Sequence, residues 1–421
     1  MSTLHVAPNK KHDVIVIGAG TGGAAVAARL ARARPDLDIA IVDPSPFHYY
    51  QPAWTLVGGG QYAIGRTRRA TSQVVPAGVA YLEDSVTAFL PETNAVLLGS
   101  GEQLNYDFLV VAAGIQLNWK AIEGLPETLG KNGVSSNYRY DLAPYTWECV
   151  QGMQGGVAIF TQPAGAIKCA GAPQKALYLA ADALKKRKVK VDLRFHTAAP
   201  ALFGVPFYSQ ALDKVIALYG AQANLGSNLV SVDGPAKTAV FESVVNGSKV
   251  RETVSFDFLH VVPPQSAPDF IQNSSLADAT GWLDVDKLTL QHVRYTNIFG
   301  IGDCTSTPNS KTAAAIKSQA PVVAGNLLLA LKGREAAAHY DGYAACPLTT
   351  SAGKVLLAEF CYGGTVSPTL GLDPRVPRRF YWWLKKSFFP AFYWHILIRG
   401  RNWASLHKKR DFPEQLPEIR A

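Results

Sequence analysis

One cysteine lies in a loop that is expected to lead directly into the N-terminus of a helix. Cys169 lies in IKCAGAPQK (167–175), after the apolar run VAIF and before a helix expected to start near Ala172 and Pro173, because proline suits a first helical turn. A helix N-terminus and the adjacent Lys168 both favour a thiolate, and thiols in such surroundings reach a pKa of roughly 3.5–7.5. The position therefore predicts a nucleophilic, redox-active cysteine rather than a buried structural one.

The other four cysteines are harder to interpret. Cys346, in AACPL, lies far along the chain from Cys169, so the sequence does not show that they meet, and alone it suggests a core thiol. Cys304 is expected to be packed without a chemical role, and Cys361, in an apolar alternating run, to lie in the core. Cys149 is expected on a structural helix, with a part in catalysis left open. There is no C-x-x-C pair and we expect no metal site. Five cysteines are too few for a disulfide framework, so any disulfide would be redox-active.

The elements near the N-terminus predict a dinucleotide site. The run DVIVIGAGTGGAAVAARLARARPDLDIAIVD (13–43) indicates a strand, a glycine turn, a helix and a second strand. Gly18, Gly20 and Gly23 match the fingerprint G-x-G-x-x-G in its required context. They allow a tight turn, a close approach by pyrophosphate and close helix packing. Asp43 follows the last glycine by about 20 residues, where a carboxylate accepts the ribose hydroxyls.

Two later segments favour FAD over NAD at this site. The apolar strand of GIGDC (300–304) ends in Gly302 and Asp303, which resembles the motif whose aspartate binds the ribityl chain of FAD in flavoproteins with two nucleotide-binding domains. Asp303 also suits the N-cap of the small-residue helix that follows, and both roles are compatible. VVAAG (110–114), ending in Gly114, resembles the mid-chain glycine strand of the same class.

A second α/β region begins near Gly155 and lacks a nicotinamide fingerprint. It predicts a strand at VAIF, a helix through APQKALYLAADALKK and a strand at VKVDLRF, followed by a hairpin that turns at Asn246 and Gly247. An NADH dehydrogenase of this fold would carry a second G-x-G-x-x-G after VAIF. Here Pro163 interrupts the turn and Lys168 and Cys169 occupy the loop. The electron donor is therefore expected to reduce the flavin through sulfur chemistry.

The C-terminal segment 376–410 predicts attachment to a membrane surface. Nine of the fifteen residues 380–394 are aromatic, and from Arg375 to Arg410 there are ten Lys or Arg and no Asp or Glu. Pro390 suggests two short helices whose apolar faces lie in the interface while basic residues meet anionic lipid. The basic residues of this segment assigned to lipid are Lys385, Lys386, Arg399, Arg401, Lys408, Lys409 and Arg410. An oligomer interface is the alternative; the clustering of aromatics argues against a nucleic-acid surface.

Length and composition set the domain organisation. The chain has 421 residues, 48% of them hydrophobic, and a net charge of +9, most of it in the tail. No apolar run is long enough to span a membrane, and the N-terminus shows no secretory signal. We expect the first part of an FAD-binding domain at 1–150, a second Rossmann-like domain at 151–290, the second part of the FAD domain at 291–345 and a redox-cysteine and membrane-interface region at 346–421.

Longer motifs indicate a family. The chain resembles the sulfide:quinone oxidoreductase family, in the branch that includes the mitochondrial enzyme, from about residue 13 to the tail. The motifs that carry the resemblance are YYQPAWTLVGGG (49–60), KCAGAPQKALYL (168–179), LHVVPPQSAPD (259–269), GWLDVDKLTLQH (281–292), GIGDCTSTPNSKTAAA (300–315) and YDGYAACPLTT (340–350). The implied fold is α/β: two Rossmann-like domains of the glutathione-reductase-like flavoprotein type, plus the membrane-binding segment.

The resemblance also implies site residues. FAD would be held with help from Gln51 and the backbone near Val86. Lys311, Thr312, Ala313 and Ala314 would place a helix N-terminus at the pyrimidine edge of the flavin, where it favours the negative charge of the reduced form. Cys169 and Cys346 would form the redox pair at the flavin. Phe360 and the aromatics 380–394 are the first candidates for a quinone pocket.

The resemblance implies a reaction as well. Hydrosulfide attacks a disulfide, or a sulfur-bridged form of it, between Cys169 and Cys346. Cys346 keeps the persulfide, Cys169 passes two electrons to the flavin, and quinone takes them from the flavin. The persulfide sulfur leaves on glutathione, sulfite or another sulfide. The protein would be monotopic on a bacterial or mitochondrial inner membrane, with a homo-oligomer left open.

Two other functions remain open from the sequence. One is a type II NADH:quinone dehydrogenase; the other is a non-catalytic, membrane-bound flavin- or sulfur-binding protein. Proton carriers are not identified: His196 and His260 are expected to be packed core residues, and roles for Glu359 and Lys175 have no support from the sequence alone.

Overall fold

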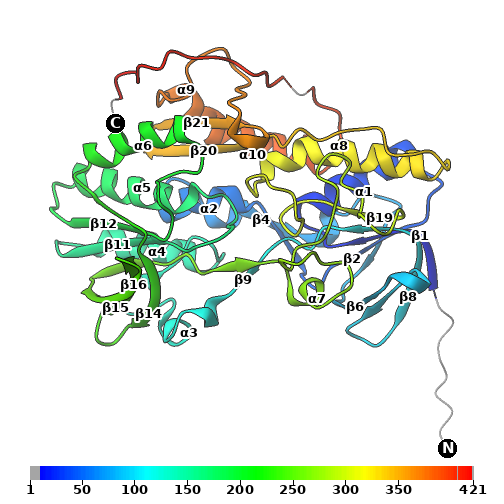
Figure 1. Ribbon diagram of the computed structural model, residues 1–421, viewed down its shortest axis with the longest axis horizontal. Helices are drawn as coiled ribbons and strands as arrows, with labels where there is room; N and C mark the ends of the chain where they lie inside the picture. The colour runs from blue at the N-terminus through cyan, green and yellow to red at the C-terminus, as the bar shows by residue number, and fades with distance from the viewer. Residues whose placement is uncertain (1–9, 405, 420–421) are drawn as a thin grey trace, which may run out of the picture.

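The computed structural model describes residues 10–404 and 406–419. The prediction that there is no secretory signal rests partly on residues 1–9, which lie outside the described part. The predicted membrane segment 376–410 contains Ser405, which lies outside it as well. Within the described part, two α/β units stand side by side under a layer formed by the C-terminal third of the chain (Figure 1).

A seven-stranded sheet supports the glycine loop. Its strands run in the order β5 (Ala80–Leu82), β2 (Ile39–Val42), β1 (Lys10–Ile17), β8 (Gln103–Val111), β7 (Ala95–Leu98) and β6 (Val86–Leu90), and β19 (Ile298–Gly300) pairs with β8. Strands β5, β2, β1, β8 and β19 are parallel. The apolar run of β1 is buried because helices cover the faces of a parallel sheet. Helix α1 (Thr21–Ala33) follows β1, so the predicted strand, glycine turn and helix are confirmed.

The second unit is built on a five-stranded parallel sheet. Its strands run in the order β10 (Val134–Ser135), β17 (Phe258–His260), β11 (Val157–Gln162), β12 (Asp192–Thr197) and β13 (Gln222–Leu225). The helices that accompany it are α4 (Leu142–Gly152), α5 (Ala172–Lys186) and α6 (Pro206–Leu218). Strand β11, helix α5 and strand β12 follow one another as predicted, and their connection places the loop with Cys169 at the C-terminal end of the sheet, where α/β folds bind ligands.

The predicted hairpin is confirmed on a smaller sheet. Strands β14 (Asn228–Asp233), β15 (Thr238–Val245) and β16 (Ser248–Ser255) are antiparallel. Asn246 and Gly247 turn between β15 and β16, both with positive φ, as a two-residue hairpin loop of this twist requires. Shorter elements complete the unit boundaries: β3 (Phe47–Tyr49), α2 (Trp54–Gly58), β4 (Arg68–Ala70), β9 (Gln116–Leu117), α3 (Leu125–Thr128), β18 (Gln265–Ser266) and α7 (Asp269–Gln272).

The C-terminal third forms the covering layer. Helix α8 (Ala313–Ala330) packs against α1, and the hairpin of β20 (Ala344–Ser351) and β21 (Lys354–Phe360) packs against α5. A helical run follows, from α9 (Arg379–Trp383) through α10 (Phe389–Phe392) to residue 397. The remaining chain then runs back over the top of the molecule toward the second unit (Figure 1).

Pro390 does not separate two helices, contrary to the prediction. It lies in the first turn of α10, and the run from 379 to 397 stays helical. The turns on either side, Leu384–Phe388 and Tyr393–Leu397, are π-helical. A proline removes one backbone donor from the helix, which accounts for a local widening of the turn at this point. In residues 10–404 and 406–419, no helix is long and apolar enough to cross a membrane.

Candidate active site

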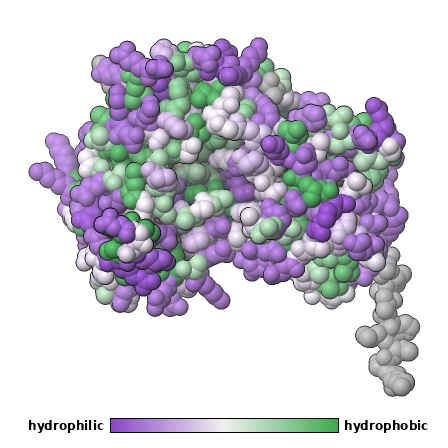
Figure 2. Space-filling view, viewed as in Figure 1, coloured by the Kyte–Doolittle hydropathy of each residue, from purple (hydrophilic) through white to green (hydrophobic). Residues whose placement is uncertain are grey.

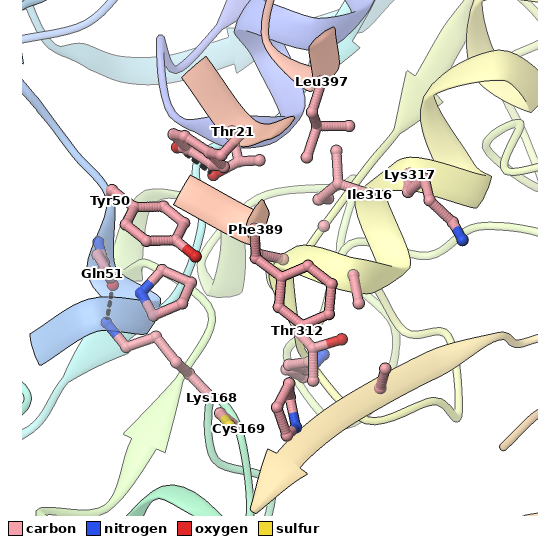
Figure 3. Close-up of a pocket in the computed structure, with 18 of the residues that line it drawn as sticks. Thr21, Tyr50, Gln51, Lys168, Cys169, Thr312, Ile316, Lys317, Phe389 and Leu397 are labelled. Carbon is pink, nitrogen blue, oxygen red and sulfur yellow. Dashed lines mark hydrogen bonds between the residues drawn. The ribbon is translucent and has the colours of Figure 1, made fainter. Parts of the chain in front are cut away.

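A large cavity of about 570 Å³ runs from the glycine loop of the first unit to the helical run of the covering layer. Residues from many parts of the chain line it, among them the glycine loop, the loop with Cys169, the N-terminus of α8 and the aromatic segment. Figure 3 shows side chains from these elements converging, with Phe389 of α10 reaching into the middle of the space. The cavity therefore joins the predicted nucleotide site to the predicted membrane segment.

The glycine loop has the geometry of a dinucleotide site. Gly18 has φ +98°, which favours glycine, and Gly20 lines the cavity with open space beside it. A Cβ on Gly23 would lie 1.8 Å from the carbonyl oxygen of Gly18, so only glycine permits this contact between helix and strand. Asp43 lines the cavity, and its carboxylate accepts the backbone N–H of Ala19 at 2.6 Å. Burial raises the pKa of Asp43.

The later glycine segments reach the same cavity. Gly114 follows β8, has φ +73° and lines the cavity, as do Gly302 and Asp303 after β19. Helix α8 begins beside them at Ala313, with Thr312 as the N-cap: the Thr312 hydroxyl accepts the N–H of Ala315 at 3.2 Å. Thr312, Ala313 and Ala314 line the cavity, so the first turn of α8 faces it.

Three of the predicted cofactor residues, Gln51, Lys311 and Val86, differ in their contacts and in their position relative to the cavity. Gln51 lines the cavity and accepts a hydrogen bond from the ammonium of Lys168. The Lys311 ammonium instead donates to the carbonyl of Thr305 at 2.9 Å and lies 3.9 Å from the ring centre of Trp282. Val86 is buried at the start of β6 and is not among the described residues that line the cavity. Its part in binding a cofactor stays a prediction.

Cys169 and Cys346 meet, which the sequence alone left open. Their sulfur atoms lie 3.4 Å apart. Cys169 lines the cavity, whereas Cys346 on β20 is fully buried behind it. The N–H of Cys169 donates to the carbonyl of Lys311 at 2.8 Å, and its φ of +53° is unusual for a residue with a side chain. Such strain persists only where the surroundings impose it, as they often do at functional sites.

The lysine beside the thiol is Lys175, not Lys168. The ammonium of Lys175, one turn into α5, lies 3.0 Å from the sulfur of Cys169. Lys168 points away from that sulfur toward Gln51 (Figure 3). The side chain of Lys168 is held over Trp54 and Tyr138, with its ammonium 5.8 and 5.7 Å from their ring centres. The prediction that Lys168 is the cation beside the Cys169 sulfur is therefore wrong.

A second lysine reaches the pair from the aromatic segment. Lys385 is only 5% exposed, and its ammonium donates to the carbonyl of Pro347, the residue after Cys346, at 2.9 Å. The prediction that Lys385 faces lipid is therefore wrong. Lys385 is the buried residue of the π-helical turn Leu384–Phe388 and lines the cavity. The covering layer therefore supplies one wall of the cysteine site.

The electrostatics of the pair are asymmetric. A hydrogen bond from the Cys346 thiol, followed by the charge of Lys175, holds the pKa of Cys169 well below its usual range. The same hydrogen bond, together with burial, holds the pKa of Cys346 well above it. Burial and the neighbouring charge of Lys175 lower the pKa of Lys385 well below its usual range. The pair thus carries one thiolate, on Cys169, and one proton, on Cys346.

The remaining cysteines lie outside the cavity. Cys304 is fully buried, and burial raises its pKa to about 11, so the predicted packing role is confirmed. Cys149 on α4 is half-buried with a pKa raised by burial, which disfavours a reactive role. Cys361 was expected in the core, but it follows β21 and is partly exposed, with its thiol 3.5 Å from a carboxylate oxygen of Asp341.

The two histidines are packed, as predicted. His196 stacks on Phe241 with ring centres 3.8 Å apart, and burial lowers its pKa to about 4. His260 is fully buried, accepts the N–H of Asn137 at 3.0 Å, and has a pKa lowered by burial to about 3. Phe360, a candidate for the quinone pocket, packs against Phe203 instead and is not among the described residues lining the cavity.

A buried acid for which the sequence alone supported no role lies in the cavity. Glu359 on β21 is 3% exposed and lines the cavity. Its carboxylate accepts the hydroxyls of Tyr343 at 2.7 Å and Thr369 at 2.6 Å. Lys317 of α8 lines the same part, and burial lowers its pKa while the charge of Glu359 opposes this. Glu359 is the single acid in the otherwise apolar run VLLAEF of β21, and an acid inside such a buried strand is the sequence signal that points to it.

The covering layer is tied directly to the glycine loop. The hydroxyl of Tyr393 is 2.9 Å from the hydroxyl of Thr21 and 2.6 Å from Nε2 of His48, whose Nδ1 is 2.8 Å from the carbonyl oxygen of Ala19. All of these atoms are buried or partly buried. The segment that the sequence assigned to a membrane therefore also closes the nucleotide site.

These residues fit FAD. The glycine loop and the N-terminus of α8 present backbone N–H groups to a single elongated cavity, and a carboxylate stands at each of two points along it, Asp43 and Asp303. The cysteine pair flanks the same space at the far end. This donor set suits a molecule with a pyrophosphate, two hydroxylated chains and a ring system.

Comparisons with known proteins agree with this arrangement. Residues 12–145 match the model of the pyridine nucleotide-disulphide oxidoreductase family. Mitochondrial sulfide:quinone oxidoreductase of Dictyostelium discoideum is 46% identical over 92% of this chain and 86% of the relative. That of Mus musculus is 39% identical over 92% of this chain and 87% of its own. The solved sulfide:quinone oxidoreductase of Aquifex aeolicus, 22% identical, covers 93% of this chain and 92% of its own with a TM-score of 0.76, and so shares the fold. By this similarity over nearly its whole length, the chain belongs to the sulfide:quinone oxidoreductase family.

Proposed function

We propose that the chain oxidises sulfide with FAD as cofactor and passes the electrons to a quinone. The observation that carries the proposal is the cysteine pair, with sulfurs 3.4 Å apart, on the wall of a cavity fit for FAD. When bound, FAD accepts two electrons at a time and releases them to a quinone. The chain supplies the sulfur chemistry on one side of it and an apolar space on the other.

The cysteines carry the sulfur step. In the oxidised enzyme an S–S bond joins Cys169 and Cys346; hydrosulfide attacks it, the S–S bond breaks, and a new S–S bond leaves a persulfide on Cys346 and a thiolate on Cys169. Two electrons from sulfide are then held at Cys169, which lines the cavity. The gap of 3.4 Å also admits one bridging sulfur, because two S–S bonds of about 2.05 Å span at most about 4.1 Å.

The two lysines prepare the pair for this step. Lys175 places a positive charge 3.0 Å from Cys169 and stabilises the thiolate that forms there. Lys385, whose pKa burial lowers, stands at Cys346 as a group able to give and take a proton near the persulfide. This arrangement supports an electron-donating thiolate on Cys169 and the persulfide on Cys346.

The quinone is assigned to the apolar end of the cavity. Residues of the helical run and of the chain after it line that end: Phe380, Leu384, Phe388, Phe389, Phe392, Leu397, Trp403 and Leu406. Glu359 is a buried acid in the lining of the same cavity and accepts a hydrogen bond from Tyr343; we assign to it the supply of the protons that a reduced quinone takes up.

Attachment to a membrane surface accompanies this assignment. Phe380 and Trp383 are 50% and 51% exposed, and Trp403 and Leu406 are exposed beside the cavity. In the space-filling view, hydrophobic residues gather in the upper middle of one face while hydrophilic residues cover most of its rim (Figure 2). A lipid interface would cover these aromatics and deliver a quinone to the cavity. The protein is accordingly assigned to the surface of a mitochondrial or bacterial inner membrane.

The reaction also needs an acceptor for the sulfur. It is a small nucleophile, glutathione, sulfite or a second sulfide, that takes the outer persulfide sulfur from Cys346.

The domain organisation is proposed as the sequence predicts it. We retain the division into an FAD-binding domain at 1–150 and 291–345, a second Rossmann-like domain at 151–290 and a C-terminal region at 346–421. A homo-oligomer is compatible with these assignments.

Steady-state turnover distinguishes this function from the alternatives. The purified holoenzyme is mixed with a short-chain quinone and either sulfide or NADH, and quinone reduction is followed by absorbance. We expect reduction with sulfide and none with NADH. Reduction by NADH would favour a type II dehydrogenase, and reduction by neither would favour a non-catalytic flavoprotein.

A further inference from the structure

Three metal-ligating side chains from separate parts of the chain converge outside the flavin cavity. Asp341 precedes β20, Cys361 follows β21, and His407 lies in the chain that returns over the top of the molecule. One ligating atom from each lies within 4.8 Å of the other two. Nε2 of His407 is 2.7 Å from a carboxylate oxygen of Asp341, and the sulfur of Cys361 is 3.5 Å from the same oxygen. The reaction proposed above uses none of them.

We propose that Asp341, Cys361 and His407 bind a divalent transition-metal cation of the Zn²⁺ class. Thiolate, imidazole and carboxylate together suit Zn²⁺, whereas Mg²⁺ and Ca²⁺ prefer all-oxygen ligands. Zn²⁺ bonds of about 2.0–2.3 Å set tetrahedral ligands roughly 3.2–3.8 Å apart. The histidine and carboxylate atoms, now 2.7 Å apart, need to separate by only about 1 Å to admit the ion. Water completes the fourth position.

The surroundings hold the ligands in place. The carboxylate of Asp341 accepts the backbone N–H of Tyr343 at 3.0 Å. The His407 ring stacks on the ring of Tyr343, with centres 4.1 Å apart. The backbone N–H of Cys361 donates to the carbonyl of Thr365 at 2.9 Å, which fixes the end of β21. Groups that orient metal ligands in this way commonly strengthen binding.

The position gives the metal a structural consequence. His407 follows Trp403 and Leu406, which line the apolar end of the cavity, and its stacking partner Tyr343 donates to Glu359 inside the cavity. A cation shared by His407, Asp341 and Cys361 would clamp the returning chain onto the hairpin of β20 and β21. It would thereby fix the wall of the cavity from which the chain of a quinone enters.

Titration with Co²⁺ tests the site. The full-length holoenzyme is oxidised, which occupies Cys169 and Cys346, then freed of metal with a chelator, and Co²⁺ is added while the visible ligand-field bands beyond the flavin absorption are recorded. We expect one equivalent per chain with tetrahedral intensity, displaced by Zn²⁺. Cys361→Ser and His407→Ala should each weaken binding by at least about tenfold. Cys149→Ser, a half-buried cysteine elsewhere, should leave it unchanged.

X-ray absorption of the zinc-loaded protein gives a second, activity-independent readout. We expect one sulfur among the ligands in the wild type and none in Cys361→Ser, and a rise in the thermal midpoint with Zn²⁺ that is lost in the variant. Binding of equal strength in wild type and Cys361→Ser, an absence of tetrahedral Co²⁺ bands, or a shell of nitrogen and oxygen alone would overturn the proposal. Flavin content and quinone reduction of the variants report on folding separately.

Discussion

The ammonium of Lys175 lies 3.0 Å from the sulfur of Cys169, one turn further along the helix that the cysteine precedes. Lys175 is buried, and Cys169 is partly buried on the wall of the cavity. Burial alone would lower the pKa of Lys175, but the charges of the cysteine pair and the hydrogen bond to Cys169 together outweigh burial and raise that pKa. The two form an ion pair that keeps the cysteine deprotonated and the lysine charged, and the sulfur chemistry proposed here depends on it.

Replacing Lys175 with methionine should make Cys169 less reactive. Without the cation the pKa of the Cys169 thiol rises, and a rise of about one unit moves the pH profile of alkylation by iodoacetamide up by about one unit, which slows the reaction up to about tenfold at pH values below the pKa. The rate is measured on the reduced protein by mass spectrometry of the peptide that contains Cys169, across a pH series. The rate in the variant should recover at higher pH.

Lys186→Met is the matched control, because Lys186 lies on the same helix but pairs with Asp182 on the surface. Its alkylation profile should match that of the wild type. An unchanged profile in Lys175→Met would show that other groups set the pKa of Cys169.

Glu359→Gln should separate the two halves of the reaction. Reduction of the flavin by sulfide takes place at the cysteines and should be unaffected. Reoxidation by quinone should slow on the order of a hundredfold, if Glu359 passes protons to the quinone as a general acid. Stopped-flow absorbance measures each half separately. Equal slowing of both halves would indicate damage to the fold, and slowing of neither would remove the acid from the reaction.

Exposed aromatics should control membrane binding. The double change Phe380→Ser and Trp383→Ser removes two half-exposed rings, and we expect binding to anionic vesicles to weaken by about tenfold or more. Flotation with vesicles measures this. Val244→Ser with Val245→Ser removes apolar side chains that are 69% and 51% exposed on β15, away from the covering layer, and should have no effect. Equal loss in both pairs would contradict a specific membrane face.

Buried histidines should make the fold less stable in mild acid. Burial lowers the pKa of His48 and His196 to about 4 and that of His260 to about 3. Below about pH 6.5 these histidines take up protons in the unfolded chain, whereas in the folded chain they stay neutral until about pH 4 or below. The free energy of unfolding should fall as the pH falls through this window, by up to about 1.4 kcal/mol per pH unit for each histidine.

Urea unfolding of the wild type and His260→Gln between pH 6.5 and 4.5 checks this expectation. Glutamine can still accept the N–H of Asn137 but does not titrate in this range. The variant should lose stability less steeply than the wild type, by the contribution of one proton. Parallel curves would mean that other groups cause the loss.

The fold could be predicted to the extent that its motifs are local. The glycine loop, Asp43 and the hairpin turn at Asn246 and Gly247 each need only a short stretch of chain, and all are present. Val86 was predicted from resemblance, and the described structure places it as a buried residue at the start of β6, outside the described lining of the cavity. The meeting of Cys169 and Cys346 depends on how two distant segments pack, which no local pattern encodes.

The positions of Lys385 and Lys175 also depend on packing in space, which the local sequence does not encode. Lys385 has basic and aromatic neighbours in the sequence, so its composition suggested lipid, and only the packing of the helical run turns it toward Pro347. Lys175 was passed over for Lys168 because adjacency in sequence was taken for adjacency in space. Side chains in a helix tilt toward its N-terminus, so the side chain of Lys175 in the first turn of α5 can reach back over the loop that precedes the helix.

Anaerobic mixing of the oxidised holoenzyme with sulfide, in the absence of quinone, tests directly whether sulfide reduces the flavin through Cys169 and Cys346. The flavin absorbance is followed in the wild type, Cys169→Ser, Cys346→Ser and the control Cys149→Ser. We expect rapid bleaching in the wild type and Cys149→Ser, and bleaching at least about 1,000-fold slower in each of the other two. Rapid bleaching in either Cys169→Ser or Cys346→Ser would contradict this expectation.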